Sequence, residues 1–347
     1  MSKVAQIISD LQKIETGYGL MSLTWRPDPI PKDTAFESMK RVIDIALARK
    51  TKAFFNVGEF YGPNQVNLTL VKDFFEKYPE LRQHVIVSCK GGMHGPTLTP
   101  RGKYEDVLAN VDSSVKAMGG YIDVFEVARL DGSLLKEGDV YPRESFRALV
   151  EKVDEGKIGA ISLSEVNESH IRAIAADWKK YLACVEVELS LFSPNILNDG
   201  VAKACSDLGL IIICYSPLSR GLLTGEITPS STFKPGDFRG LLKRFQGDAI
   251  AKNQVCIDFL NSVIQERPAD KRISLVQLAL GWVKHWSTVE EFKGAKFIPI
   301  PSGSTVAKVN ENFDEEKGKI TDAEFTKINE FLKEFETVGD RYEFISK

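Results

Sequence analysis

The stretch Val85-Ile86-Val87-Ser88-Cys89-Lys90-Gly91-Gly92 is an apolar run that ends in a lysine and two glycines, and a helical pattern over residues 104–118 follows it. An apolar, β-branched run bounded by glycine predicts a buried strand. The same order of strand and then helix recurs along the chain. The further expected strands and helices are 18–21 with 34–50, 53–55 with 66–78, 122–127 with 145–153, 160–163 with 169–178, 185–187 with 201–208, 210–215 with a long excursion, and 297–300 with 306–313.

Eight strands that alternate with helices predict a parallel sheet covered by helices. No linker rich in Pro, Gly or Ser and no shift in composition divides the 347 residues. We therefore expect the α/β class and one domain over residues 1–347, a closed (β/α)8 TIM barrel. An open, doubly wound sheet is the alternative. Two segments depart from the repeat: residues 226–249, rich in Pro, Gly and charge, and residues 321–332, which we expect to form an added C-terminal helix.

The composition is that of an ordinary globular protein, with 45 Lys and Arg against 48 Asp and Glu and a formal net charge of −3. A nearly neutral chain lacks the positive field that binds nucleic acid or an anionic membrane surface, so we expect neither partner. The most apolar run, residues 208–215, is far shorter than the ~20 residues that cross a bilayer.

Residues 1–13 lack the uninterrupted apolar run and the cleavage site of a secretory signal. The five cysteines are widely spaced and form no CxxC pair, which favours reduced thiols. Both observations point to a cytoplasmic protein, with the nucleus as a further option. The four histidines are not at ligand spacing, so we expect no metal site.

The stretch Gly17-Tyr18-Gly19-Leu20-Met21-Ser22 is one residue short of the dinucleotide-binding pattern GxGxxG. That pattern has to open a helix, whereas the proline-rich residues 27–31 follow here. We therefore do not expect a Rossmann-type dinucleotide domain.

Three strand ends carry groups that suit proton transfer. In a barrel the loops after the strands form the active site, so residues at these ends are brought together. The first apolar run leads into Tyr61, the second ends in Lys90, and the third ends in Arg129. A lysine at such a position is, by itself, as consistent with a surface residue as with a catalytic group. A tyrosine beside it has a pKa of about 10, which a nearby ammonium group lowers toward the range of a general acid.

The order and the amino-acid sequences of these strand ends resemble the aldo-keto reductases. Members of that family are NADPH-dependent (β/α)8 oxidoreductases, and their first motif usually reads FDTAxxYG. Here that motif reads Phe55-Asn56-Val57-Gly58-Glu59-Phe60-Tyr61-Gly62, and the resemblance extends from Gly17 to about Phe313. Residues 19–27 and 56–62 resemble a fungal branch of this family, the pyridoxal reductases.

The resemblance implies that Tyr61 donates the proton and that Lys90 lowers the pKa of Tyr61. Asn56 stands where the family has an Asp, and Ala128 stands where it has a His, so Lys90 loses an ion pair and the substrate carbonyl loses a donor. Glu126 has the same strand parity as Ala128 and is expected to face the barrel interior. Whether it replaces either missing group or only pairs with Lys90 stays open.

The resemblance also implies a wall for the nicotinamide half of NADPH. Ser164 falls where the family binds the carboxamide, and Tyr215 falls where a ring stacks on the nicotinamide. Glu165 and Glu186 replace an Asn and a Gln, and an ionised Glu186 can accept from the carboxamide but cannot donate to it. Ser216, Pro217 and Leu218 continue the family's cofactor motif after Tyr215, and the loop 219–225, which includes Gly221 and Leu222, is expected to hold the pyrophosphate through free backbone N–H groups.

A phosphate site is expected at the last strand end, where Ser302, Gly303 and Ser304 lead into a helix. Hydroxyls, amides and the helix dipole favour an anion there.

Residues 308–312 of that helix resemble the family pattern RxxEN. This implies that Lys308 meets the adenosine 2′-phosphate and that Glu311 and Asn312 contact adenine. Lys308 keeps the charge of the usual Arg but lacks its flat fork. A cation at this position favours NADPH over NADH.

We therefore expect an enzyme that reduces an aldehyde to an alcohol with NADPH, with pyridoxal, a compound of vitamin B6 metabolism, as the first choice of substrate. Trp25 and Phe60 are expected to line an apolar pocket for a flat ring, with Glu126, Ala128 and Arg129 beside it, although each also fits ordinary packing or the surface. Two alternatives remain: a reductase of other aldehydes or ketones, and an NADPH-binding redox sensor or docking subunit with weak turnover. The oligomeric state stays open between a monomer and a weak dimer.

Two local features lead to further predictions. Glu126, Glu165 and Glu186 fall at strand ends and predict an unusually acidic active-site wall. Residues 226–249 follow the expected phosphate loop, and we hypothesise that they form a lid over the cofactor pyrophosphate.

Overall fold

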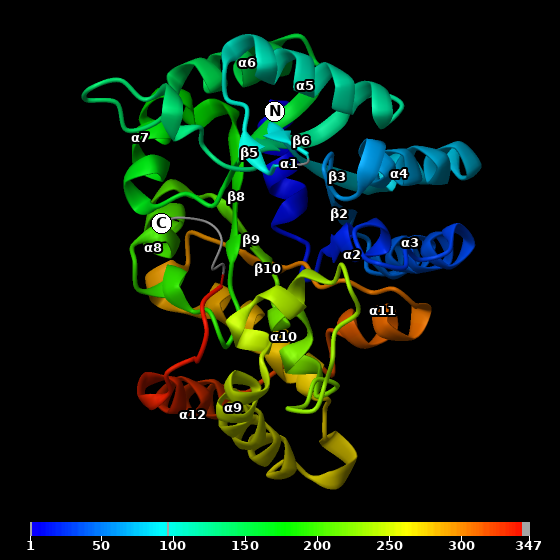
Figure 1. Cartoon of the computed structure of the whole chain (residues 1–347), viewed down its shortest axis with the longest axis vertical. Coiled ribbons are helices and arrows are strands. Elements are labelled where there is room, and N and C mark those ends of the chain that lie inside the picture. Colours follow the sequence, from blue (N-terminus) through cyan, green and yellow to red (C-terminus); the bar gives the residue numbers. More distant parts are fainter. Residues whose placement is uncertain (1, 96, 342–347) are drawn as a thin grey trace.

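The computed structural model describes residues 2–95 and 97–341 (Figure 1). Eight strands pair side by side and in parallel, in the order β1–β2–β3–β6–β7–β8–β9–β10. Their bounds are β1 Tyr18–Gly19, β2 Ala53–Gly58, β3 Val85–Gly91, β6 Ile122–Val127, β7 Ile158–Ser164, β8 Leu182–Glu188, β9 Ile211–Tyr215 and β10 Phe297–Pro299. All eight predicted strands are confirmed. The first is shorter than expected, because residues Met21–Thr24 form the helical turn α2.

The two outer strands of this order are joined by backbone hydrogen bonds that close the sheet. Gly17 N–H donates to Pro299 O at 2.9 Å, and Gly19 N–H donates to Pro301 O at 3.1 Å. A Cβ at Gly19 would lie 2.8 Å from Ile300 O, so only glycine permits this close approach. The predicted (β/α)8 barrel is therefore confirmed, and the open sheet is excluded.

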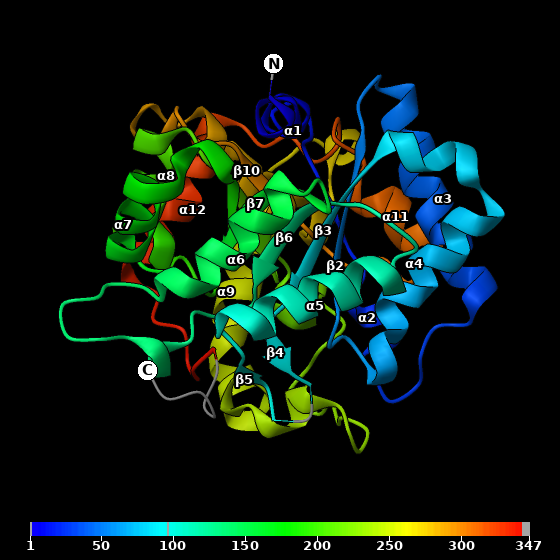
Figure 2. The same cartoon turned by 90° about the horizontal axis from the view of Figure 1, so that it is seen from above.

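Helices surround the strands (Figure 2). Those that follow strands as predicted are α3 Lys32–Ala48, α4 Val66–Lys77, α5 Tyr104–Ala117, α6 Arg143–Asp154, α7 Glu168–Trp178, α8 Val201–Leu208 and α11 Val306–Asn312. The predicted C-terminal helix is α12, Asp322–Glu334. Three helices were not predicted, namely α1 Lys3–Leu11, α9 Gly247–Gln265 and α10 Leu275–His285. A two-stranded hairpin, β4 Met93–His94 with β5 Thr99–Pro100, adds to the loop after β3.

The barrel interior changes character along its axis. Its floor is apolar, because Phe54, Ile86 and Val124 point inward, and Ile7 and Leu11 of α1 are buried against this cluster. Successive inward positions lie two residues apart, so later residues of the same strands face the same interior. Those later residues are polar, and they are Asn56, Lys90, Glu126, Ser164 and Glu186. The polar chemistry is therefore gathered at the C-terminal ends of the strands.

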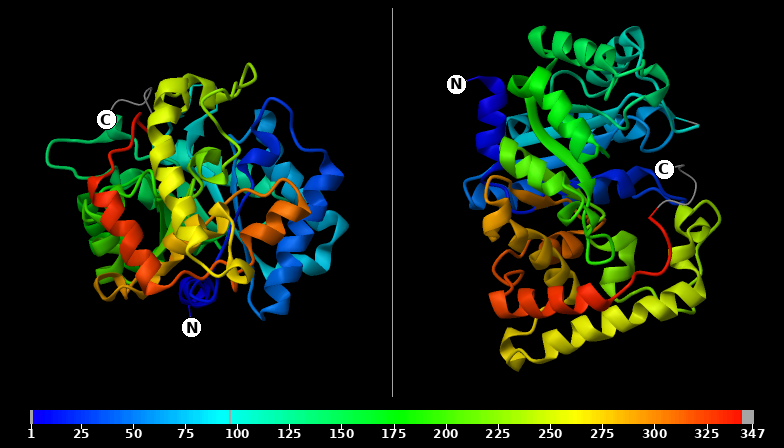
Figure 3. Two further views of the ribbon diagram at one scale, coloured as in Figure 1. Left: turned by 90° about the horizontal axis from the view of Figure 1, so that it is seen from below. Right: turned by 90° about the vertical axis from the view of Figure 1, so that its left-hand side faces the viewer.

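The N-terminal helix and the C-terminal segment lie on opposite sides of the barrel (Figure 3). Helix α1 closes the floor, whereas the segment after α12 runs to the side where the strands end. Within the described part of the chain, no helix combines the length and the apolar character that crossing a membrane requires.

Candidate active site

Tyr61 and Lys90 are brought together by the register of β2 and β3. Gly58, the last residue of β2, pairs with Lys90, and the ring of Tyr61 folds back over Gly58. A Cβ at Gly58 would lie 2.8 Å from Tyr61 Cγ, so a larger residue would push the ring away. Both side chains are buried, and the phenol is one of the groups that raise the pKa of Lys90. The tyrosine and the lysine therefore form one site at the strand ends.

Lys90 has a carboxylate partner from the far side of the barrel. Its Nζ lies 2.5 Å from Glu186 Oε1 and 3.6 Å from Glu126 Oε1. Asn56 Nδ2 donates to Glu186 Oε2 at 2.7 Å, so Asn56 orients the same carboxylate. The expectation that Lys90 loses its ion pair is wrong, because Glu186 of β8 supplies the charge that residue 56 lacks.

The charges around Lys90 are arranged to keep it protonated. Burial lowers the pKa of Lys90, but Glu186, Tyr61 and Glu126 together outweigh burial and raise the pKa well above its ordinary value. Burial also raises the pKa of Glu126 well above its ordinary value, and the neighbouring Glu186 carboxylate raises it further, against the opposing effect of Lys90. The site therefore favours an ammonium at Lys90 and a neutral acid at Glu126.

Aromatic rings cover Tyr61 on its open side. The ring of Trp25 stacks on Tyr61 with centroids 5.8 Å apart, and Phe60 meets Tyr61 edge to face at 5.2 Å. Thr24 Oγ1 donates to Tyr61 O at 2.6 Å and ties the Trp25 loop to the tyrosine. Trp25 remains 41% exposed, so its ring has a face that a ligand can reach.

The other predicted pocket residues lie at the end of β6. Ala128 is buried, and its N–H donates to Gly91 O at 2.8 Å. Arg129 Nη1 lies 3.7 Å from Glu165 Oε2, so its guanidinium turns toward the end of β7.

The expected nicotinamide wall lies on β7, β8 and β9. Ser164 is 2% exposed, and its Oγ has no hydrogen-bond partner among the described residues. Tyr215 ends β9, its Oη donates to Glu165 Oε1 at 2.8 Å, and Lys90 Nζ lies 5.3 Å from its ring centroid. Glu165 and Glu186 of the predicted acidic wall both meet cations here, since Glu186 pairs with Lys90 and Glu165 pairs with Arg341.

The loop after β9 has a backbone suited to binding an anion. Ser216, Ser219, Arg220 and Gly221 all have positive φ, between 48° and 106°. Such turns point N–H groups toward a common side. The N–H groups of Ser219, Gly221 and Leu223, however, donate to carbonyls within the loop, so the expectation that these groups are free for a pyrophosphate is wrong. The remaining predicted loop residues are Pro217 and Leu218, which belong to the same turn, and the buried Leu222.

The link between β10 and α11 is held together by side-chain contacts. Asn312 Nδ2 donates to Ser302 O at 3.0 Å, and Tyr18 Oη donates to Gly303 O at 2.5 Å. Asn312 is buried, and the neighbouring Ser304 and Glu311 are partly exposed. Asn312 thus shapes the Ser302 turn in addition to any contact with adenine.

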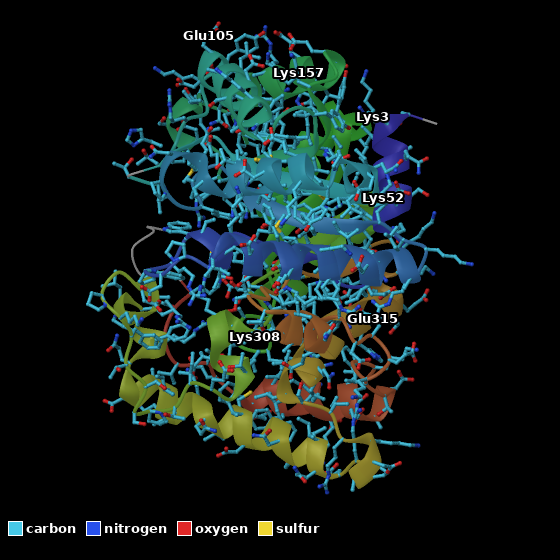
Figure 4. All side chains as sticks on the ribbon, turned by 90° about the vertical axis from the view of Figure 1, so that its right-hand side faces the viewer. Lys3, Lys52, Glu105, Lys157, Lys308 and Glu315 are labelled. Atoms are coloured by element: carbon cyan, nitrogen blue, oxygen red, sulfur yellow. The ribbon has the colours of Figure 1, made fainter. Side chains whose placement is uncertain are left out.

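Residues 226–249 contact two separate parts of the chain. Glu226 Oε2 lies 3.8 Å from Lys308 Nζ, which sits beside this segment (Figure 4). Lys234 Nζ reaches 2.6 Å from Asp28 Oδ2 in the loop after β1. The segment therefore runs from α11 to the Trp25 loop, and its role as a lid stays a hypothesis.

If residues 226–249 are a lid, saturating NADPH should slow their cleavage by a protease severalfold, because the bound cofactor would hold them closed. The measurement is limited proteolysis with mapping of the cut sites. The loop 132–141 on another side of the barrel is the internal control and should be cut at an unchanged rate. Equal cleavage of 226–249 with and without NADPH would contradict the lid.

Two residues of the site were missed from the sequence. Glu188 is fully buried at the end of β8 and lies two residues after Glu186, so strand parity alone was a usable signal. Arg341 bonds to Glu188, Glu165 and Tyr215 although it lies 126 residues after Tyr215. It follows the last helix and belongs to no repeated pattern, so no sequence signal pointed to it.

Comparison with known proteins agrees with this geometry. The model of the Aldo/keto reductase family matches residues 15–333, which include all eight strands and the polar strand ends. The chain belongs to the aldo/keto reductase family. The resemblance inferred from its strand-end motifs is thereby confirmed.

Individual members of the family are similar over most of the chain. A Saccharomyces cerevisiae protein named "Putative pyridoxal reductase" is 60% identical over 341 residues, which cover 98% of this chain and 99% of that protein. The Schizosaccharomyces pombe aldo-keto reductase yakc, whose name carries NADP(+), is 34% identical over 67% of this chain and 64% of its own length. The solved structure of a glycerol dehydrogenase from Gluconobacter oxydans has a TM-score of 0.72 and covers 96% of this chain and 95% of its own, at 19% identity, and shows the shared fold.

Proposed function

We propose that this aldo-keto reductase reduces pyridoxal to pyridoxine with NADPH. The observation that carries the proposal is the buried group of Tyr61, Lys90 and Glu186, in which a phenol lies beside an ammonium paired with a carboxylate at 2.5 Å. Such a group can give a proton to a carbonyl oxygen and stabilise the phenolate that remains. The name of the yeast relative supports the substrate.

In this mechanism Tyr61 Oη gives its proton to the substrate oxygen. Lys90 stays an ammonium because the Glu186 carboxylate raises its pKa, and its charge favours the phenolate form of Tyr61. Asn56 holds Glu186 in place through the hydrogen bond to Oε2. Trp25 and Phe60 screen the phenol from water and offer flat apolar faces to a pyridine ring.

The chain has groups that fit a nicotinamide dinucleotide. Ser164 offers a buried hydroxyl with no partner among the described residues, which suits a carboxamide. Tyr215 offers a ring, and Lys308 suits a 2′-phosphate. When bound, NADPH supplies the hydride. The name of the yakc relative supports the choice of NADPH over NADH.

The test is a steady-state assay of NADPH and NADH oxidation with pyridoxal and with a panel of other aldehydes and ketones. We expect NADPH-dependent turnover with kcat/KM highest for pyridoxal. Lys308→Ala should raise the KM for NADPH about 10-fold, because one charged contact to the phosphate is lost, and should leave the KM for NADH unchanged. Lys317→Ala is the matched control, since Lys317 is also exposed but lies outside the expected phosphate site.

The outcome of this assay distinguishes a pyridoxal reductase from the two alternative functions. Equal kcat/KM across the panel would identify a general carbonyl reductase. Tight NADPH binding without turnover of any substrate would instead identify a binding or sensor protein. Both results would overturn the pyridoxal reductase proposal.

A further inference from the structure

The last described residues, 336–341, form a segment that we call the C-terminal arm. It leaves α12 and returns to the side of the barrel where the strands end (Figures 1 and 3). The buried Asn253 of α9 binds its backbone twice, since Nδ2 donates to Val338 O at 3.0 Å and Val338 N–H donates to Oδ1 at 2.9 Å. These reciprocal bonds fix the path of the arm from outside the active site.

A second anchor lies one residue further along. Arg244 is buried, and its Nε donates to Gly339 O at 3.1 Å. Gly339 has a φ of +90°, and a Cβ there would lie 2.5 Å from the backbone nitrogen of Arg244, so only glycine fits. The two anchors deliver Arg341 to one defined place.

Arg341 joins the ends of three neighbouring strands. Its Nε donates to Glu188 Oε2 at 3.0 Å, at the end of β8. Its Nη2 lies 3.0 Å from both oxygens of Glu165, which follows β7, and 2.9 Å from Tyr215 Oη, at the end of β9. One guanidinium thus contacts two carboxylates and a phenol, a geometry that a lysine cannot reproduce.

These contacts restrict the ring of Tyr215. Its hydroxyl donates to Glu165 at 2.8 Å and accepts from Arg341 at 2.9 Å, so rotation of the side chain breaks both bonds. Arg341 also fixes the Glu165 carboxylate, which accepts the hydrogen bond from the Tyr215 hydroxyl. The orientation of the ring therefore depends on a residue at the far end of the chain.

Arg341 is not the only cation beside the buried Glu188 carboxylate, so neutralising that charge does not depend on Arg341 alone. Burial raises the pKa of Glu188, but Arg220 and Arg341 outweigh burial and lower it. Arg220 Nη2 lies 3.3 Å from the same Glu188 oxygen, so a cation stays beside Glu188 if Arg341 is removed. The protein should therefore fold without the Arg341 guanidinium.

We propose that Arg341 is a positioning residue for reduction, because it holds Glu165 and Tyr215 so that the Tyr215 ring presents a fixed face to the nicotinamide. This inference rests on the proposed NADPH-dependent function. It makes the C-terminal arm a part of the active site, supplied from outside the eight βα units.

The test compares the full-length wild type with Arg341→Ala and Arg341→Lys. Three quantities are measured: kcat and KM for pyridoxal, the emission of NADPH bound without aldehyde, and the melting temperature. We expect kcat of Arg341→Ala to fall at least about 10-fold, because misplacement of a reacting group is costly, while KM for pyridoxal changes little. The fluorescence emission of bound NADPH should change as well. Arg341→Lys should give values of kcat and of this emission between those of the wild type and those of Arg341→Ala.

Two further variants separate positioning from stability. Asn253→Ala removes one of the two anchors of the arm without touching Glu165, Glu188 or Tyr215, and should lower kcat in the same direction. Arg82→Ala is the matched control, because Arg82 makes comparable bonds to Val85 O, Tyr121 O and Asp123 near the beginning of β3 and β6. It should lower the melting temperature but leave kcat and the NADPH emission unchanged.

The positioning role is overturned if Arg341→Ala matches the wild type in kcat and in NADPH emission, or if Arg82→Ala shows the same losses. A rise in kcat would also overturn it, since the arm would then obstruct the site. The proposed function fails separately if the wild type does not turn over pyridoxal. In that case a changed NADPH emission in Arg341→Ala still supports the role of Arg341, and an unchanged emission overturns it.

Discussion

Glu186→Gln will lower kcat/KM for aldehyde reduction by about 100-fold, because it removes the carboxylate that lies 2.5 Å from Lys90. Without that charge the pKa of Lys90 falls, so the ammonium is lost at a lower pH than in the wild type. Activity should then decline as pH rises through this lower pKa. The measurement is the profile of kcat/KM against pH, whose alkaline limb should move to lower pH.

Glu126→Gln is the matched control for this prediction. It removes the other carboxylate near Lys90, whose Oε1 lies 3.6 Å from Nζ. Since the raised pKa of Glu126 favours the neutral acid, glutamine should replace it with less than about a 3-fold loss of kcat/KM. Similar losses in Glu186→Gln and Glu126→Gln would contradict the assignment of Glu186 as the main partner.

A second change should restore the ion pair from the other side. Asn56 contacts Glu186 through Nδ2 at 2.7 Å, and it stands where the family usually has an Asp. The double variant Asn56→Asp with Glu186→Gln keeps one carboxylate and one amide but exchanges their positions. We expect it to recover at least about 10-fold of the loss in Glu186→Gln, because the buried ammonium again has a charged partner. No recovery would show that the position of the carboxylate, and not only its charge, is required.

Tyr61→Phe should lower kcat by about 1000-fold, since the ring remains but the proton that it gives to the substrate is gone. The stacking on Trp25 at 5.8 Å and the contact with Phe60 at 5.2 Å do not involve the hydroxyl, so the pocket should keep its shape. The Kd for NADPH, measured by fluorescence titration, should change little.

Trp25→Ala provides the contrast for Tyr61→Phe. It removes a ring that is 41% exposed and meets both Phe60 and Tyr61, so its main effect should be a higher KM for pyridoxal. Undiminished turnover in Tyr61→Phe would exclude Tyr61 as the proton donor.

The strands were predictable because their signal is local. Runs such as Val85–Cys89 and 160–163 are apolar and short, and they lie between turn residues, so each marks a buried strand without knowledge of its neighbours. The same reasoning failed for α9 and α10. These helices lie in the long excursion between β9 and β10, where no strand separates them and the regular alternation of strand and helix is interrupted.

Helix α1 also carried a local signal that was left unused. Val4, Ile7 and Leu11 are spaced by three and four residues and are buried together in the barrel floor. This spacing is typical of an amphipathic helix. Its role in closing the floor depends on the closed barrel, which the pattern of α1 does not reveal.

By itself the sequence determined the (β/α)8 fold and the pairing of Tyr61 with Lys90, because adjacent parallel strands place their C-terminal ends together. Only the tertiary structure decided that Glu186 is the partner of Lys90 and that Arg341 completes the wall around Tyr215. Closing the barrel brings inward side chains of non-neighbouring strands within ion-pair distance. The length of each side chain then decides which oppositely charged group it reaches. Local patterns contain no distance between strands, so these two contacts become apparent only in three dimensions.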